Sequence, residues 1–409
     1  MSSRRSSRQG WIALCLCTLL VTATMFLPAD APSKAKALHG NRGSEWRLLP
    51  PVTYQNLTLF PITTLNVNPS TADAYITLDE GIKNGTVIIT ERGAEGSIAQ
   101  RTPGQGGANQ VQVSATRGGS ATVNQLSLIN KSGKKLLLLA GEVVVGGKQD
   151  RIVEEDLIVP PVSVPISINV FCVEHGRWSP RGQAASNRAN VVRQSRIQNP
   201  RIRNNENARS NPRVQSVPQP VSHNDHSFSS LGAISHPKLR AAAQDKKQQG
   251  EVWKEVSANN ARLGTATSTD TYQEVYASKK VAGTMENYIR ALEKSVLAPN
   301  VVGVVVARNG ELVWADAFAS PALFAKYWPK LLKSYVIDAM SEQHIRRNRR
   351  PTIFEAQQYL QELQGTSSAA GKPGIYRLTK TEHAQYAIFR LEDISLPAAL
   401  RLHFNKMNR

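Results

Sequence analysis

The chain has 409 residues, with 50 lysines and arginines, 31 acidic residues and a formal charge of +19. Its three cysteines exclude a disulfide-rich scaffold, and its length allows one large domain or two ordinary ones. The excess positive charge suggests an acidic partner, although the location of the charge matters more than its total.

Residues 1–37 predict an export signal. Three arginines among the first ten residues precede an unbroken apolar run over 11–27, and small residues follow, which is the layout of a secretory signal. Pro32 would block cleavage after Ala31, so we expect the cut after Ala37. We therefore expect a periplasmic or extracellular protein. The alternative is a membrane anchor formed by residues 11–27, which are at the short limit for a spanning helix.

Cleavage would change both the charge and the cysteine content. The removed segment carries five bases and one acid, so the mature chain would have a charge of about +15. It would keep only Cys172, so no disulfide could form within the chain and the fold must rest on a packed core.

Residues 38–47 read as an N-terminal extension, and 48–405 as a single domain whose first part, 48–180, is β-rich. Short runs of β-branched residues separated by turn signals predict strands there. A capping box, Thr77 with Glu80, predicts one short helix that Gly85 ends. Residues 130–133 predict a hairpin turn.

Residues 181–222 predict a disordered basic insert. Eight arginines and one glutamate lie between Arg181 and Ser216, and such a segment buries too little apolar surface to fold. It suits contact with an acidic surface, such as phospholipid headgroups or polyanionic wall material. The alternative is a solvated linker. Nucleic acid is not favoured, because aromatic residues that stack on bases are missing from the run.

Residues 223–405 predict a mixed part. Apolar spacing predicts helices over 237–263 and 271–296, and Asn309-Gly310 between two apolar runs predicts a hairpin. Further helices should begin at Ser320-Pro321, with a kink or restart at Pro329, and at the capping box of Thr352 and Glu355. The tail predicts strands and a final amphipathic piece. Strands first and helices later indicate an α+β fold.

Candidate site residues lie in two segments. In residues 141–156, Gly146 and Gly147 allow a sharp turn or a close ligand approach. The side chains around this pair suggest a binding rim. Glu142 and Asp150 would be acid/base groups, Gln149 a ligand contact, and Arg151 an anion-binding group. The alternative is a tight turn with solvated charges and an internal Asp–Arg pair. The spacing does not match a phosphate-binding Walker loop.

The second segment is residues 171–178. Glu174 and His175 would move protons, Arg177 would bind an anion, and Trp178 would stack on a sugar or base. The alternative has Cys172 in the core, Glu174 paired with Arg177 and Trp178 at the core edge. His223 and His226 look like ligands but lack a helix to set their spacing, so no metal site is predicted, and no cofactor is specified. Trp253, Trp314 and Trp328 are assigned to the core.

Two motifs carry a family resemblance. LAGEVVVGGKQDRIVEEDLIVPP and the following NVFCVEHGRW resemble the ADP-ribosylglycohydrolase- and rhodanese/phosphatase-superfamily-associated protein domain, a bacterial family of unknown function. Segments 251–272 and 318–339 are similar to its later part. The resemblance spans roughly residues 50–405, apart from the insert. It implies an association with enzymes of ADP-ribose or phosphoesters, not a mechanism.

Three functions remain open at this point. The first is an exported protein that binds a ligand or partner in the cell envelope, with Gly146–Arg151 and Glu174–Trp178 as its site. The second is a hydrolase of a glycosidic or phosphoester bond, using Glu142, Asp150, Glu174 or His175. The third is a structural envelope protein that uses the basic insert as an electrostatic tether.

Overall fold

The computed structural model describes residues 46–65, 69–92, 124–177, 226–343 and 349–409. The chain divides into residues 1–36 and a compact unit, 37–409, to which all described residues belong. The predicted signal and the predicted insert over 181–222 lie outside the described residues. Within the described ranges, no helix has both the length and the apolar character needed to cross a membrane.

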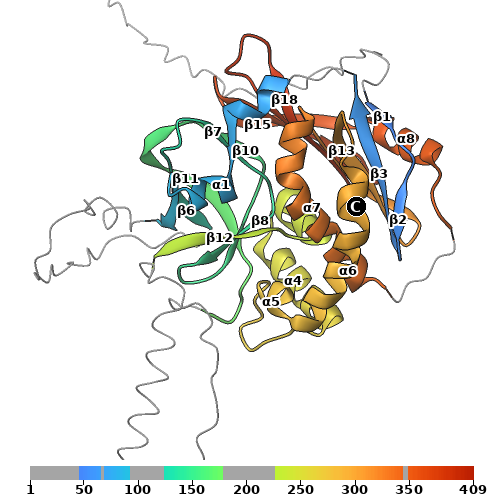
Figure 1. The fold of residues 1–409 in the computed structure, drawn as a ribbon. Coiled ribbons are helices and arrows are strands. Elements are labelled where there is room, and N and C mark those ends of the chain that lie inside the picture. Colours follow the sequence, from blue (N-terminus) through green and yellow to red (C-terminus); the bar gives the residue numbers. More distant parts are fainter. Residues whose placement is uncertain (1–45, 66–68, 93–123, 178–225, 344–348) are drawn as a thin grey trace, which may run out of the picture. The chain divides into compact units, whose positions relative to one another are not determined.

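A closed six-stranded barrel forms from the β-rich part and one later strand (Figure 1). Around the barrel the strand order is β11-β6-β5-β12-β8-β9. The strands are β5 (Val87–Glu91), β6 (Gln125–Asn130), β8 (Glu142–Gly146), β9 (Arg151–Val153), β11 (Val162–Cys172) and β12 (Ser227–Ile234). The barrel therefore closes only when β12, which follows the predicted insert, reaches the earlier strands.

A three-stranded sheet has the strand order β10-β7-β4. Along the sequence, its strands precede or lie between the strands of the barrel. Its members are β4 (Tyr75–Thr77), β7 (Lys135–Leu138) and β10 (Leu157–Val159). A 3-10 helix, η1 (Pro69–Ala74), precedes β4, and the helix α1 (Leu78–Lys83) follows it with the predicted capping box of Thr77 and Glu80.

A nine-stranded antiparallel sheet joins the two ends of the chain. Its path is β1-β3-β13-β14-β18-β17-β16-β15, with β2 also paired to β3. The early strands are β1 (Trp46–Leu48), β2 (Val52–Tyr54) and β3 (Leu57–Thr64). The late strands are β13 (Val301–Arg308), β14 (Glu311–Phe318), β15 (Thr366–Lys372), β16 (Tyr376–Glu382), β17 (Tyr386–Asp393) and β18 (Leu400–Asn408). Since β3 pairs with β13, the first strands are completed by residues more than two hundred positions later.

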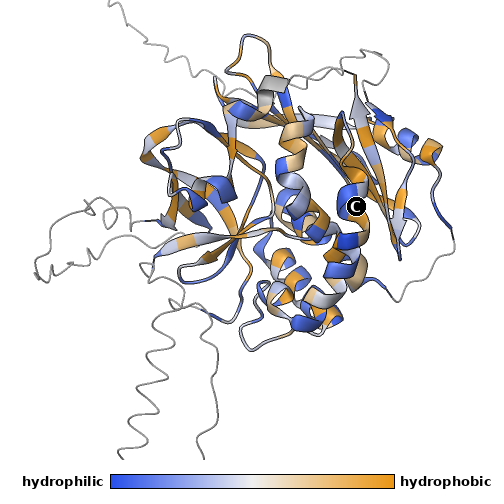
Figure 2. Ribbon diagram, viewed as in Figure 1, coloured by the Kyte–Doolittle hydropathy of each residue, from blue (hydrophilic) through white to orange (hydrophobic). Residues whose placement is uncertain are grey.

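Helices fill the space between these strands. The longest, α7 (Pro321–Ser341), contacts both β13 of the large sheet and β12 of the barrel. The other helices are α3 (Pro237–Ala241), the π-helix η4 (Ala242–Lys246), α4 (Gln249–Leu263), α5 (Glu274–Ala277), α6 (Lys279–Val296) and α8 (Ile353–Gln361). Hydrophobic and hydrophilic residues occur in both strands and helices (Figure 2), and central strands such as β13 are buried over nearly their whole length.

The predicted α+β fold class is confirmed, with a β-rich N-terminal half and helices in the C-terminal half. The Asn309-Gly310 hairpin and the capping box at Thr352 are also confirmed. Both long helical predictions are confirmed with interruptions. Lys247, in the left-handed region at φ 52°, separates η4 from α4, and Ser278 caps α6 directly after α5.

Two local predictions are wrong. The predicted hairpin at residues 130–133 is a turn between different sheets, because β6 pairs with β5 and β11 whereas β7 pairs with β4 and β10. The Asn130 amide closes this turn by donating to the carbonyls of Lys134 and Val159, at 2.8 and 3.0 Å. The second error is the helix restart predicted as one of two outcomes at Pro329, since α7 continues through this residue; the other outcome, a kink, stays a prediction. Packing of α7 on both sides outweighs one missing hydrogen bond.

The close approach of β13 and β14 generates a stability prediction. A Cβ at Gly303 would overlap the Asp316 carbonyl oxygen and lie 2.6 Å from the Ala317 Cα. Gly303→Ala should therefore lower the free energy of unfolding by about 1–3 kcal/mol, measured by urea denaturation. Gly250→Ala is the matched control, because Gly250 lies in α4 with open space around it. That variant should be neutral or stabilising by up to about 1 kcal/mol, and equal losses in both variants would contradict the prediction.

Candidate functional site

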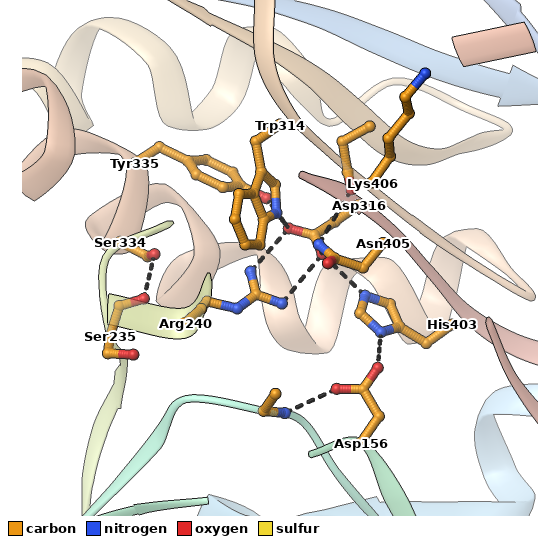
Figure 3. A network of polar contacts seen from close by, with 12 residues as sticks. Asp156, Ser235, Arg240, Trp314, Asp316, Ser334, Tyr335, His403, Asn405 and Lys406 are labelled. Carbon is orange, nitrogen blue, oxygen red and sulfur yellow. Dashed lines mark hydrogen bonds and ion pairs between the residues drawn. The ribbon is translucent and has the colours of Figure 1, made fainter. Parts of the chain in front are cut away.

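A buried polar centre lies where the large sheet meets the helices and the barrel (Figure 3). Strand register assembles it. Trp314 and Asp316 are two residues apart on β14 and therefore share a face, as do His403 and Asn405 on β18. Asp316 is directly opposite Asn405 in the β14–β18 pairing. We call this group, with Asp156, Arg240 and Tyr335, the Asp316 centre.

The Asp316 carboxylate is the acceptor that organises this centre. It forms a two-pronged ion pair with Arg240, with nitrogen–oxygen distances of 3.0 and 3.2 Å. Other donors are the Trp314 indole at 2.8 Å, the Asn405 amide at 2.9 Å, the His403 ring at 3.0 Å and the Tyr335 hydroxyl. Burial would raise the pKa of Asp316, but the charges and hydrogen bonds of Arg240 and His403 lower it well below its usual range.

His403 links this centre to the barrel side of the molecule. Its Nδ1 lies 2.5 Å from Asp156, whose other oxygen accepts from the Ala140 N–H at 2.8 Å. Burial would lower the pKa of His403, but the two carboxylates of Asp156 and Asp316 raise it to about 9. His403 is therefore a buried cation at neutral pH, shared between two buried anions.

A second buried ion pair involves the same segment, residues 139–156, to which Asp156 belongs. Glu142 binds Lys330 of α7, and Lys330 also lies 2.7 Å from Asp79 of α1. Burial and the nearby Asp79 raise the pKa of Glu142 despite the charge of Lys330. Glu142 is 1% exposed, so the structure places this predicted catalytic residue inside the packing between barrel and helix.

Five predicted site residues do come together, around Arg177. The guanidinium lies 2.7 Å from Glu174 and 3.4 Å from Asp150, and it donates to the Gly147 carbonyl at 2.8 Å and the Gly146 carbonyl at 3.3 Å. We call these residues the Arg177 cluster. Its three charged side chains are 8% exposed or less, so the cluster fastens the glycine turn to the end of β11.

The remaining predicted residues are near this cluster but do not form a cleft with it. Gln149 donates to the Glu174 carbonyl at 2.8 Å, and buried Arg151 donates to Gln149 and to the Asp150 carbonyl at 3.3 Å. His175 is exposed and packs edge-on against Trp253 at 4.5 Å.

Some predictions fall on residues that the structure does not describe, or concern groups that it does not gather. Trp178 and His223 lie outside the described residues. Within the described ranges, no group of three metal-ligating side chains converges.

Two open clefts lie elsewhere. The first, the Trp314 cleft, has a volume of about 770 Å³, and its apolar lining includes Leu312, Val313 and Trp314. Its walls carry six basic and six acidic residues. One of them, Asp338, is 2% exposed and pairs through Oδ2 with Arg308 at 2.5 Å. The other oxygen, Oδ1, has no hydrogen-bond partner among the described residues.

The second, the Arg350 cleft, has a volume of about 680 Å³ and a different chemistry. Arg349 and Arg350 are its two charged residues, and none of the described residues that line it is acidic. Arg349 pairs with Glu355, whereas no ion pair with a described residue occupies Arg350. The rest of the lining is mostly uncharged and hydrogen-bonding: Thr53, Tyr54, Gln55, Asn56, Thr58, Thr284, Asn287, Tyr288, Asn309 and Gln343.

The Arg350 cleft is held in shape by two hairpin turns that contact each other. Asn56 donates to the Asn309 side chain at 2.9 Å, and the Asn309 N–H donates to the Asn56 carbonyl at 2.8 Å. Tyr288 of α6 donates to the Asn56 side chain at 2.8 Å, and Gln343 donates to the Tyr288 hydroxyl at 3.1 Å. These hydrogen bonds lie within the chain, so the wall of the cleft forms without a ligand.

The two clefts adjoin, because Gly310 and Arg349 line both. Sequence reasoning missed them. It identified Asn309-Gly310 as a turn and Trp314 as core, and both statements are correct, but it could not place β2, α6 and residues 349–350 around that turn. One signal was available: four arginines lie between positions 346 and 350.

Comparison with known proteins identifies a family. A family model, described as the ARG and Rhodanese-Phosphatase-superfamily-associated Protein domain, matches residues 45–218 and 222–393. No curated relative and no solved structure matches the chain. The matched ranges contain every residue that lines the Arg350 cleft, and the resemblance inferred from the motifs is confirmed.

The Asp316 centre makes a first prediction about stability. Asp316→Asn keeps the side-chain shape but leaves Arg240 as an uncompensated buried charge, so it should lower the free energy of unfolding by about 3–5 kcal/mol. Urea denaturation measures this loss. Glu286→Gln is the control, because this residue is exposed in α6 and its pair with Arg290 is 3.9 Å long, so it should cost under about 0.5 kcal/mol. A loss below about 1 kcal/mol in Asp316→Asn would contradict the role of the centre.

His403 makes a second prediction, for pH. Its folded-state pKa of about 9 exceeds the unfolded value of 6.5, so its stabilisation is complete below pH 6.5 and is lost as the pH rises through 9. The stability difference between the native chain and His403→Gln should therefore shrink over this range, by up to about 3 kcal/mol. Burial lowers the pKa of Lys406 to about 8, so this residue contributes to stability with the opposite pH dependence. Because Lys406 is present in both proteins, its contribution cancels in the difference. A pH-independent difference would refute the buried cation.

Proposed function

Since the chain belongs to the family of the ARG and Rhodanese-Phosphatase-superfamily-associated Protein domain, whose name states no reaction, we propose a function from its clefts. The protein is an exported binding protein that takes a hydroxyl-rich, anionic small molecule. The Arg350 cleft is the binding site. The observation that carries this proposal is the lining of that cleft, which has two arginines, no described acidic residue and ten polar side chains.

The chemistry of this lining fits one class of ligand. An arginine guanidinium presents a planar fork of donors that matches the oxygens of a carboxylate or phosphate. Amide and hydroxyl side chains both donate and accept, as the hydroxyls of a sugar require. The Tyr54 and Tyr288 rings, whose centroids are 4.9 Å apart, add amphipathic surface at the same wall. An acidic sugar or a sugar phosphate satisfies all three features.

The adjoining Trp314 cleft suits a larger ligand of the same kind. Arg349 and Gly310 are common to both clefts, so a longer ligand anchored at Arg350 would extend past these two residues into the Trp314 cleft.

The binding residues predicted from the sequence are better explained as structure. Arg151 is 2% exposed and donates to its own neighbours, so the anion-binding role assigned to it fits Arg350 better. The hydrolase alternative needs a carboxylate that faces a substrate. Glu142 is paired with Lys330, and Asp150 and Glu174 are both paired with Arg177, so these contacts favour a structural role for the three carboxylates over the acid/base role predicted for them.

Export remains part of the proposal because of the sequence. The early arginines, the apolar run over residues 11–27 and the cleavage position after Ala37 support it. A periplasmic or extracellular location would also bring acidic envelope sugars within reach of the Arg350 cleft. The basic insert over residues 181–222 is proposed as a contact with an acidic surface, independent of the cleft.

The binding proposal predicts a charge-selective ligand response. Glucuronate and glucose 6-phosphate should raise the melting temperature and bind measurably in titration calorimetry, whereas glucose should bind at least about tenfold more weakly. Arg350→Gln should weaken the charged ligands about 10- to 100-fold, because a charge-assisted hydrogen bond contributes about 1.5–3 kcal/mol.

The control for that experiment is Arg290→Gln. Arg290 is an exposed arginine of α6 that does not line the Arg350 cleft, so its removal changes the net charge by the same amount. It should leave affinity within about twofold. An equal loss of affinity in both variants would mean that net charge, and not a contact at Arg350, controls binding. Unchanged affinity in Arg350→Gln would exclude the Arg350 cleft as the site.

A further inference from the structure

The large sheet has two edges, and the structure treats them differently. At one edge, the β1 backbone is covered by α8. The Gln357 side chain accepts from the Leu48 N–H and donates to the Trp46 carbonyl, both at 3.2 Å. It therefore replaces the hydrogen bonds of a missing neighbour strand, which is a known way to prevent edge pairing.

At the other edge, none of the described residues covers β15 in this way. Its seven residues pair with β16 over their whole length, and all seven are exposed. Among the described strands, β16 is its one partner. In an antiparallel ladder, every second residue points its N–H and carbonyl away from the paired strand, so β15 presents a row of open donors and acceptors.

The sequence of β15 does not protect it either. Edge strands usually carry charges, prolines or bulges that prevent pairing. Here Thr-Ser-Ser-Ala-Ala-Gly precedes Lys372, so the first six residues are small and uncharged and include no proline. The register with β16 is unbroken. Another strand can therefore approach β15 without a steric or electrostatic barrier.

We propose that β15 pairs with β15 of a second copy of this chain, antiparallel and about a twofold axis at Ala369. This register places Thr366 opposite Lys372, so the two lysines lie at opposite ends of the joint, where they do not repel each other. A parallel arrangement would bring them side by side. The charge pattern of β15 is thus compatible with itself in the one orientation that twofold symmetry requires.

The size of the contact sets its strength. An interface of seven residues from each copy buries less than the roughly 1,000 Å² that a stable interface needs. The dimer should therefore be reversible and concentration-dependent. The formal charge of +19 on each copy opposes association. Added salt should therefore strengthen the dimer, because screening weakens the repulsion between copies more than it weakens backbone hydrogen bonds.

Sedimentation velocity over a concentration series, at about 50 and 500 mM salt, tests the proposal. The native chain should shift from monomer to dimer, at lower concentration in high salt. Ala369→Lys puts two like charges at the axis and should weaken dimerisation at least about tenfold. Ala282→Lys, on an exposed position of α6, adds the same charge away from β15 and should dimerise nearly as well as the native chain. Melting curves establish that both variants are folded.

A cross-link measures the register independently. Ala369→Cys, with Cys15 and Cys17 changed to serine, should form a disulfide between copies under oxidation, whereas Ala282→Cys should not. A native chain that stays monomeric at millimolar concentration in both salts would overturn the proposal. So would a dimer that Ala369→Lys leaves intact. Binding of an unrelated strand peptide by a monomeric native chain would overturn the second copy as the occupant and assign the edge to another protein.

Discussion

The buried carboxylate of Asp316 is the interaction on which the rest of the structure depends. A lone carboxylate in a protein interior is strongly unfavourable, and here Arg240, His403, Trp314, Asn405 and Tyr335 all donate to it. These donors come from α3, β18, β14 and α7, and His403 extends the chain of contacts to Asp156 beside the barrel. The centre is therefore complete only when sheet, helices and barrel have assembled, so it connects the stability of each part to the others.

The same centre positions the proposed binding region. Trp314 donates its indole N–H to Asp316 and is one of the residues that line the Trp314 cleft. The Arg240 guanidinium lies 4.8 Å from the centre of the Trp314 ring. The neighbouring Arg350 cleft depends on the contact between the two turns at Asn56 and Asn309. Both clefts thus lie on rigid supports, which reduces the conformational entropy that a ligand must remove on binding. The edge strand β15 lies at the far end of the same sheet, separated from β14 by three strands.

Local signals in the sequence predicted local structure well. The capping boxes at Thr77 and Thr352, the Asn309-Gly310 hairpin and the start of α7 at Pro321 were all confirmed, because each depends on hydrogen bonds within a few residues. The turn at 130–133 shows the limit of that reasoning. Its local geometry was recognised, but strand partners are chosen by distant burial, and the two strands joined different sheets. The fold does bring together the candidate residues around Gly146 and Glu174. The carboxylates of Asp150 and Glu174, however, both form ion pairs with Arg177.

By itself, the sequence determined the α+β class, the family, most of the individual helices and the Asn309-Gly310 hairpin, since periodicity, caps and turn residues act over short distances. Only the tertiary structure decided which polar residues are buried supports and which line an open cleft. Glu142 and Asp156 carry the same charges whether they face water or a partner, and their partners Lys330 and His403 lie far along the chain. Arg350 became a candidate because long-range pairing of β3 with β13 placed it beside Asn56 and Tyr288. Sequence analysis did offer the Glu174–Arg177 pair as an alternative, because the two residues are three positions apart. Burial and pairing between distant residues are properties of the folded chain, so neighbouring residues do not reveal them.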